Sequence, residues 1–173
     1  AGSLVAGGSV NTLRVGKVGG DEVGSYKDES RTEIFFEAGG SKTSISENIE
    51  SGMVAALVKT RNVEIVNLRK QLDEMAHGLI GITNAIHKKG YVNKPLPTDQ
   101  NGNVINDPSL GKVTDINFFK ESKGLSQASL NIDLSDEIQA DVKNITTGLS
   151  PNSPGDNRIA IAISKVQHEK LLG

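Results

Sequence analysis

Residues 65–86 read IVNLRKQLDEMAHGLIGITNAI, and they carry an unbroken heptad of apolar side chains. The apolar positions recur at steps of three and four residues and are Ile65, Leu68, Leu72, Met75, Leu79, Ile82 and Ile86. This spacing places all seven on one stripe of an α-helix and leaves the charged residues elsewhere. Because a period near 3.5 is typical of helix bundles and coiled coils, we expect the stripe to be buried against another long helix.

The helix that carries this stripe extends beyond it on both sides. We expect it to begin near residues 51–52, after a polar segment, and to end at Lys89 and Gly90. A lysine in the last turn complements the negative end of the helix dipole, and glycine readily takes the left-handed conformation of the C′ position. Gly90 is therefore expected to have a positive φ. The pair Arg61-Asn62 leaves open whether the segment is one continuous helix or two helices.

A glycine-rich β portion is expected before the helix. Short apolar segments predict strands at residues 4–5, 13–15 and 32–37. Glycine pairs predict turns between the strands at residues 7–8, 19–20 and 39–40. The polar residues 20–31 are expected to form a loop. A phosphate-binding loop is the alternative for this segment, but neither a GxGxxG motif nor a Walker A motif is present.

A second β region is expected after the helix. Apolar and polar residues alternate over residues 113–119 and 128–134, as they do in strands with one buried face. Before them, Asn101-Gly102 is a favoured two-residue hairpin turn. We therefore predict a hairpin followed by two strands.

A calcium-binding loop is the alternative for this hairpin. Asp99, Asn101 and Asn103 match the first three ligand positions of an EF-hand. However, Val104 stands where the motif requires glycine, and Leu110 stands where it requires a bidentate glutamate. The pattern therefore favours a plain turn.

Two shorter helices are expected near the end of the chain. Ser135 is placed to cap the first, and Asp156 or Asn157 to cap the second. Each carries apolar residues on one face, which are Ile138, Val142 and Ile145 in the first and Ile159, Ile163 and Val166 in the second. The second helix reaches the end of the chain at residues 171–173 without a convincing terminator, so we expect it to be truncated. It is the expected intramolecular partner of the heptad helix.

These elements together predict an α+β fold. Long antiparallel helices are expected to form a bundle-like core, accompanied by a glycine-rich antiparallel β portion. We divide the chain into four parts: a β-rich segment at 1–48, a long core helix or helix pair at 49–90, a hairpin and strand region forming a small outer domain at 91–134, and a short helical turn with a truncated helix packing on the core helix at 135–173.

The composition argues against several classes of partner. Lys and Arg number 19 and Asp and Glu 21, and they are scattered, so we expect no nucleic-acid partner. Aromatic residues make up 3% of the chain, with no Trp and no Cys. No run approaches the ~18 to 20 apolar residues that span a bilayer, so no membrane partner is expected either. The first eight residues, AGSLVAGG, are expected to mark an excised piece of a longer protein.

No catalytic, cofactor-binding or metal-binding residue is predicted, and the chain is not expected to be an enzyme. The histidines are His77, His87 and His168, and we expect all three on solvated helical surfaces, with the first two on a shared face but too far apart to bind one metal ion. The acidic pairs at residues 21–22, 73–74 and 136–137 are likewise expected to be solvated. No serine lies in a nucleophile-elbow motif.

The order of several motifs resembles a known family. Residues 49–57 (IESGMVAAL), Arg61, residues 72–76 (LDEMA) and residues 84–91 (NAIHKKGY) are similar to the central helix of flagellar hook-associated protein 1, the family of the hook-filament junction protein. The flanking segments also fit, including Leu4-Val5, Asn101-Gly102 and Phe118-Phe119. The chain departs from the family where Gly52 alone replaces a longer glycine-rich lead, and where Arg61-Asn62 replaces a more usual Arg-Asp.

The resemblance implies a non-enzymatic structural subunit, secreted through the flagellar type III export apparatus without a cleaved signal, in an external or periplasmic flagellum. It implies a ring of the protein's own copies that contacts the hook protein and the adjacent junction protein. An export chaperone is expected to bind a C-terminal region beyond this chain, and the fragment alone is expected to be a monomer. The alternatives are another axial protein, such as a flagellin-like or other hook-associated protein, and an unrelated extracellular adhesin or binding domain.

Overall fold

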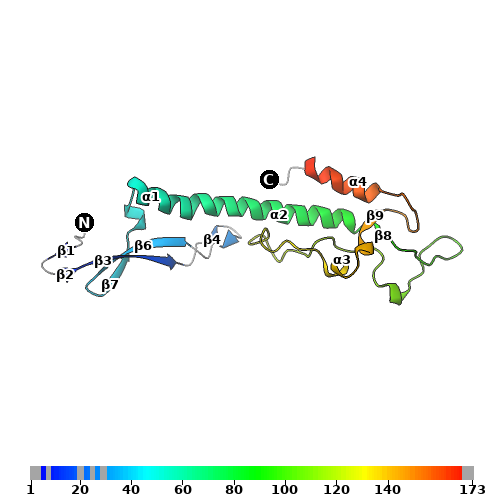
Figure 1. The fold of residues 1–173 in the computed structure, drawn as a ribbon, viewed down its shortest axis with the longest axis horizontal. Coiled ribbons are helices and arrows are strands. Elements are labelled where there is room, and N and C mark those ends of the chain that lie inside the picture. Colours follow the sequence, from blue (N-terminus) through cyan, green and yellow to red (C-terminus); the bar gives the residue numbers. More distant parts are fainter. Residues whose placement is uncertain (1–4, 7–8, 19–21, 24–25, 28–30, 169–173) are drawn as a thin grey trace. The chain divides into compact units, whose positions relative to one another are not determined.

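A computed structural model describes residues 5–6, 9–18, 22–23, 26–27 and 31–168 of the chain (Figure 1). The chain divides into two compact units, Ala1–Gln71 and Leu72–Gly173. The fold is mixed α+β, as predicted, with a long helix and small antiparallel sheets. The prediction of a bundle of long helices holds only in part, because α3 and α4 in the described residues are short.

The first unit contains antiparallel β-structure. Its main sheet has the order β3-β6-β7, and two-residue strands form two small ladders; the strands are β1 (Val5–Ala6), β2 (Ser9–Val10), β3 (Thr12–Val18), β4 (Glu22–Val23), β5 (Tyr26–Lys27), β6 (Arg31–Ala38) and β7 (Ser41–Ser44). Gly39 and Gly40 both have positive φ and make the turn between β6 and β7, as predicted. The expectation of a plain loop at residues 20–31 is wrong, because β4 pairs with β5 there. The glycine turns expected at residues 7–8 and 19–20 lie outside the described residues.

The long helix is continuous. It consists of α1 (Gly52–Lys59), a π-helical segment (Thr60–Glu64) and α2 (Ile65–His87), which follow one another without a break (Figure 1). The uncertainty at Arg61-Asn62 is thereby resolved in favour of one helix that widens locally. Asn62 in the π-helical segment binds the backbone of Thr32, since its Nδ2 donates to the Thr32 carbonyl at 2.7 Å and its Oδ1 accepts from the Thr32 N–H at 3.0 Å.

The expectation that the heptad stripe is buried is wrong for the central part of the stripe. Leu68, Leu72 and Met75 are 56%, 47% and 43% exposed. The buried positions of α2 lie on another face and are Asp73, Ala76, Ile80, Thr83, Asn84 and His87. Polar side chains occupy much of this face because they bind backbone groups of the second unit. A search for apolar periodicity in the sequence does not detect such hydrogen bonds.

The second unit contains less regular structure than predicted. Residues 113–119 and 128–134 are not strands; one isolated bridge joins Phe119 to Leu134. The predicted turn at Asn101-Gly102 is confirmed, since Gly102 has a φ of 82° and the Asp99 N–H donates to the Asn103 carbonyl. The Asn103 side-chain amide and the backbone N–H groups of Asn103 and Asn101 donate to the Asp99 carboxylate, and these hydrogen bonds lower the pKa of that group.

A small apolar core organises this unit. Its buried members are Val92 and Leu96 after the long helix, Ile116 in the segment predicted as a strand, and Ile138 in α3 (Asp136–Ala140). The strands β8 (Tyr91–Val92) and β9 (Thr146–Gly148) pair antiparallel beside it. Residues 146–148 therefore lie beside the segment that directly follows the C-terminal end of α2.

The two short helices begin as predicted. α3 (Asp136–Ala140) is capped by the Ser135 hydroxyl, and α4 (Arg158–Ser164) begins after Asn157, with Ile159 buried. The expectation that Val142 shares a buried face with Ile138 is wrong, because Asp141 has extended backbone and ends α3. Single 3₁₀ turns occur at Ser46–Asn48, Pro108–Leu110, Val142–Asn144 and Lys165–His168. The helix end expected at residues 171–173 lies outside the described residues.

Gly90 is required by close packing rather than by its φ. It is not among the described glycines with positive φ, so the expected left-handed C′ conformation is wrong. A Cβ atom at this position would lie 2.7 Å from Cβ and Oγ1 of Thr146 and 2.9 Å from Cγ1 of Ile159. The end of α2 can thus approach β9 and α4 only because residue 90 has no side chain.

Gly90→Ala is expected to lower the free energy of unfolding by about 1–3 kcal/mol, because Thr146 and Ile159 must move away from the added methyl group. Gly81→Ala is the matched control, since Gly81 lies inside α2 and a Cβ atom added there would have no neighbouring atom within 4 Å. That control should raise the free energy of unfolding by up to ~1 kcal/mol through helix propensity. Chemical denaturation measures both, and equal effects of the two substitutions would contradict the packing explanation.

Candidate functional site

The most highly organised polar cluster in the second unit lies on the buried side of α2. We call it the polar face, and it consists of Asp73, Asn84 and His87, all of which are buried. The three positions are separated by 11 and 3 residues, or about three turns and one turn of helix, so they share one side. Each binds backbone groups of a different part of the chain between residues 116 and 146.

Asp73 holds the loop around residues 125–131. One carboxylate oxygen accepts from the Gln127 N–H at 2.8 Å, and the other accepts from the Ser129 N–H at 2.8 Å and from the Ser129 hydroxyl. Hydrogen bonds to an ionised group are stronger than neutral ones, which offsets the cost of burying the carboxylate. The expectation that Asp73 is solvated is therefore wrong, although its neighbour Glu74 is only partly buried.

Asn84 takes the place of a strand partner for Phe118 and Phe119. Its Oδ1 accepts from both backbone N–H groups at 2.9 Å, and its Nδ2 donates to the Phe119 carbonyl at 3.0 Å. A side-chain amide has the same donor and acceptor groups as a peptide, so it can satisfy an extended segment without a neighbouring strand. This bonding is the physical reason why residues 113–119 need not join a sheet.

His87 connects α2 to two segments at once. Its Nδ1 lies 2.7 Å from the Ile116 carbonyl, and its Nε2 accepts from the Thr146 N–H at 2.9 Å. Because a carbonyl can only accept, Nδ1 carries the proton of the neutral ring. The Thr146 hydroxyl also donates to the His87 carbonyl at 2.7 Å, and the Phe118 ring meets the imidazole edge to face. Burial lowers the pKa of His87, while the hydrogen bond to Ile116 acts in the opposite direction.

The expectation that His87 lies on a solvated surface is wrong, since the exposed fraction of His87 is 0%. His77 is exposed, as predicted. Ten residues correspond to about 2.8 turns rather than three, which leaves the two side chains roughly 80° apart around the helix. They therefore do not share a face.

The polar face is suited to holding the fold rather than to catalysis. Each polar side-chain atom of Asp73, Asn84 and His87 has a hydrogen-bond partner within the chain. Among the described residues, no group of three or more His, Cys, Asp or Glu side chains is arranged to hold a metal ion. These three side chains therefore present no free acid, base or ligand to a substrate.

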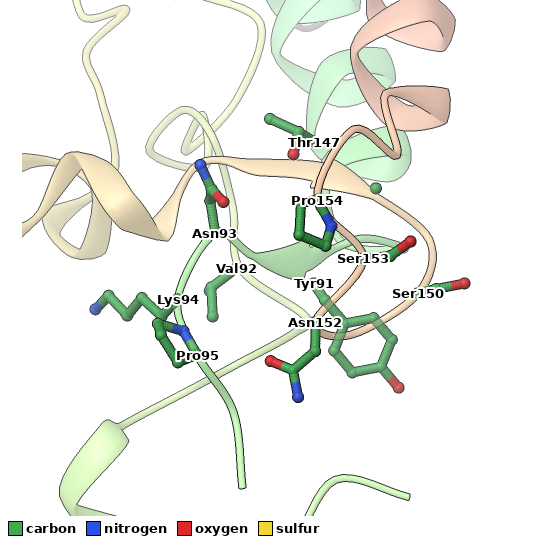
Figure 2. Close-up of a pocket in the computed structure, with 11 residues that line it drawn as sticks. Tyr91, Val92, Asn93, Lys94, Pro95, Thr147, Ser150, Asn152, Ser153 and Pro154 are labelled. Atoms are coloured by element: carbon green, nitrogen blue, oxygen red, sulfur yellow. The ribbon is translucent and has the colours of Figure 1, made fainter. Parts of the chain in front are cut away.

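A shallow cavity of about 320 Å³ lies between β8, β9 and the loop that follows β9 (Figure 2). Its lining includes Tyr91, Lys94 and Asn152. Lys94 pairs with Asp141 at 2.8 Å, and the Asn152 amide bonds to both the N–H and the carbonyl of Leu96 at 2.7 Å. Because these polar groups are already used, the cavity offers no arrangement that points to a particular ligand.

Several large apolar side chains of α2 are exposed. We call Leu68, Leu72 and Met75 the apolar stripe, which is the central part of the heptad described above. In α1, Met53 and Leu57 are exposed as well. In the described part of the chain, no helix combines the length and the apolar character needed to cross a membrane.

One signal in the sequence could have revealed the polar face. Asp73, Ile80, Asn84 and His87 recur at steps of seven, four and three residues, which is a helical spacing like that of the stripe itself. A search for apolar periodicity ignores it, because three of the four side chains are polar. The backbone groups that they bind also lie 29 to 59 residues away, so no local pattern identifies them.

The comparison with protein families gives one match. The family model of the flagellar hook-associated protein FlgK helical domain matches residues 1–105, which is more than half of the chain. No curated protein and no solved structure matches the chain. Hook-associated proteins of this family are structural axial parts of the bacterial flagellum. On the strength of the long helix and this match, the chain belongs to the family of the flagellar hook-associated protein FlgK.

Proposed function

We propose that this chain is part of the structural subunit that joins the flagellar hook to the filament. The family match supports a flagellar axial component, and the exposed apolar stripe of α2 is the observation that carries the proposal further. A heptad of apolar residues is suited to packing against other helices, as axial subunits must do when they assemble. No catalytic role is proposed for the chain.

The stripe indicates how the subunit would be held in the assembly. Leu68, Leu72 and Met75 are about half exposed in the single chain, so each forgoes only part of the roughly 1.5–3 kcal/mol that full burial of such a side chain contributes. We propose that neighbouring subunits cover them, either further copies in a ring or the hook protein and the adjacent junction protein. The isolated chain is proposed to be a monomer, because three side chains supply far less than the ~800 Å² per partner of a stable interface.

The route to the flagellum is also a proposal. Family membership implies that the protein reaches an extracellular position in the flagellum. We propose export through the flagellar type III apparatus without a cleaved signal, assisted by a chaperone that binds a region beyond this chain. The position in the flagellum can be tested directly on isolated flagella.

Immunogold electron microscopy with antibodies raised against this chain distinguishes the candidate functions. We expect gold particles at one position per flagellum, between the hook and the filament. Labelling along the whole filament would instead support a flagellin-like subunit, and labelling of the cell surface without flagella would support an adhesin. A strain that lacks the gene is the control for antibody specificity.

A further inference from the structure

His87 lies where three segments meet at the C-terminal end of α2. One ring nitrogen faces the Ile116 carbonyl and the other faces the Thr146 N–H, at 2.7 and 2.9 Å. Only a neutral imidazole can satisfy both groups, because it has one donor and one acceptor, whereas an imidazolium has two donors. The contact with Thr146 therefore depends on the charge of the ring.

We propose that His87 is an acid-sensitive latch, in which protonation of Nε2 replaces the acceptor of the Thr146 N–H by a donor and so releases β9 from the end of α2. The segment that is released matters for the rest of the unit. Thr146 begins β9, which pairs with β8, and its side chain lies against Gly90, as does the side chain of Ile159 in α4. Detachment of Thr146 therefore loosens both β9 and the start of α4.

In the described part of the chain, no charged group around this ring compensates a positive charge on it. The segments 116–119 and 146–148 carry no ionisable side chain, and β8 contributes only Tyr91. Directly after α2, Lys88 pairs with Glu121 at 3.3 Å and Lys89 is exposed. Asp115, which precedes Ile116, is exposed as well. At the start of α4, Asp156 is already paired with Arg158 at 2.7 Å. A protonated His87 would thus be a buried cation without a counter-ion, which strongly favours opening of the contact.

The direction of the pH dependence follows from this environment. Burial lowers the pKa of His87 from its ordinary value of 6.5, whereas the opened ring titrates near that value. The open form therefore binds a proton over a pH range in which the closed form does not. Below about pH 6.5 the population of the open form should rise roughly tenfold per pH unit, until the pH reaches the pKa of the closed form.

Hydrogen exchange measured by NMR on the full 173-residue chain tests the latch. We expect the protection factor of the Thr146 amide, corrected for intrinsic exchange, to be constant above about pH 6.5 and to fall about tenfold per pH unit below it. His87→Gln should abolish this dependence, because its carbonyl can accept from Thr146 and does not titrate. His77→Gln is the matched control, since His77 is exposed on the same helix, and it should leave the dependence intact.

The nitrogen chemical shifts of the His87 ring provide a second readout that does not require a variant to fold. They should show the Nδ1-protonated neutral form at about pH 7.5. They should change to those of imidazolium only at a lower pH than the pH at which the Thr146 amide begins to lose protection, because the closed form with its neutral ring still predominates there. A Thr146 protection factor that stays constant down to about pH 5, or ring shifts that change to those of imidazolium with a midpoint at or above about pH 6.5, would overturn the proposal.

Discussion

Asp73→Asn is expected to lower the free energy of unfolding by about 2–4 kcal/mol, although it changes the size of the side chain very little. Asp73 accepts from two backbone N–H groups and one hydroxyl, and it has no donor of its own. An asparagine must turn its NH₂ group toward one of these donors. A buried N–H group then loses its partner, and the remaining bonds lose their charge assistance. Urea denaturation measures the change.

Glu64→Gln is the control for Asp73→Asn, since it also removes one carboxylate from the long helix but at an exposed position. Its effect should stay within about 0.5 kcal/mol. If Asp73→Asn were as harmless as Glu64→Gln, the carboxylate would not hold the loop at residues 125–131. The polar face would then not stabilise the fold through Asp73.

Asn84→Ala is the second substitution with a large expected effect. It removes three hydrogen bonds to the backbone of Phe118 and Phe119 and leaves those groups without their present partner. We expect the free energy of unfolding to fall by about 2–4 kcal/mol, even though alanine is the better helix former. Thermal and urea denaturation both report the change, and exchange of the Phe118 and Phe119 amides should accelerate under native conditions.

Asn67→Ala makes the same chemical change at an exposed position of α2. This control should be neutral or slightly stabilising, because only the helix propensity changes. The difference between the two variants isolates the bonds that Asn84 makes. Equal stabilities of Asn84→Ala and Asn67→Ala would show that these bonds contribute nothing to the fold.

The parts of the fold that depend on local rules could be predicted from the sequence. The start of the long helix at Gly52, the turn at residues 39–40 and the Ser135 cap each follow from nearby residues, and the structure confirms them. The alternation at residues 113–119 is equally regular, yet no strand forms there. Asn84, more than 30 residues away, binds the backbone groups that a neighbouring strand would otherwise bind.

The same limit explains the errors on α2. The heptad correctly predicts a long helix, but it cannot show which side of the helix is covered within this chain. Solvated positions are expected for Asp73 and His87 because isolated acids and histidines usually are exposed. Their burial depends on backbone groups of Gln127, Ser129 and Thr146, and no pattern within α2 contains that information.

We propose that the apolar stripe of α2 serves assembly of the flagellum and not the fold of the chain. Leu68→Glu and Leu72→Glu, introduced together, place two charges on the stripe. Asn67→Glu and Gln71→Glu are the matched control, because they place the same charges on exposed polar positions one residue earlier along the same helix.

Swimming motility and electron microscopy of flagella, in cells that carry each pair of substitutions in the chromosomal gene, test this claim most directly. We expect the Leu68/Leu72 pair to give hooks without filaments and the Asn67/Gln71 pair to swim normally, while both purified chains unfold at similar urea concentrations. Normal filaments and swimming in the Leu68/Leu72 pair, with the protein present at its usual level, would contradict the claim.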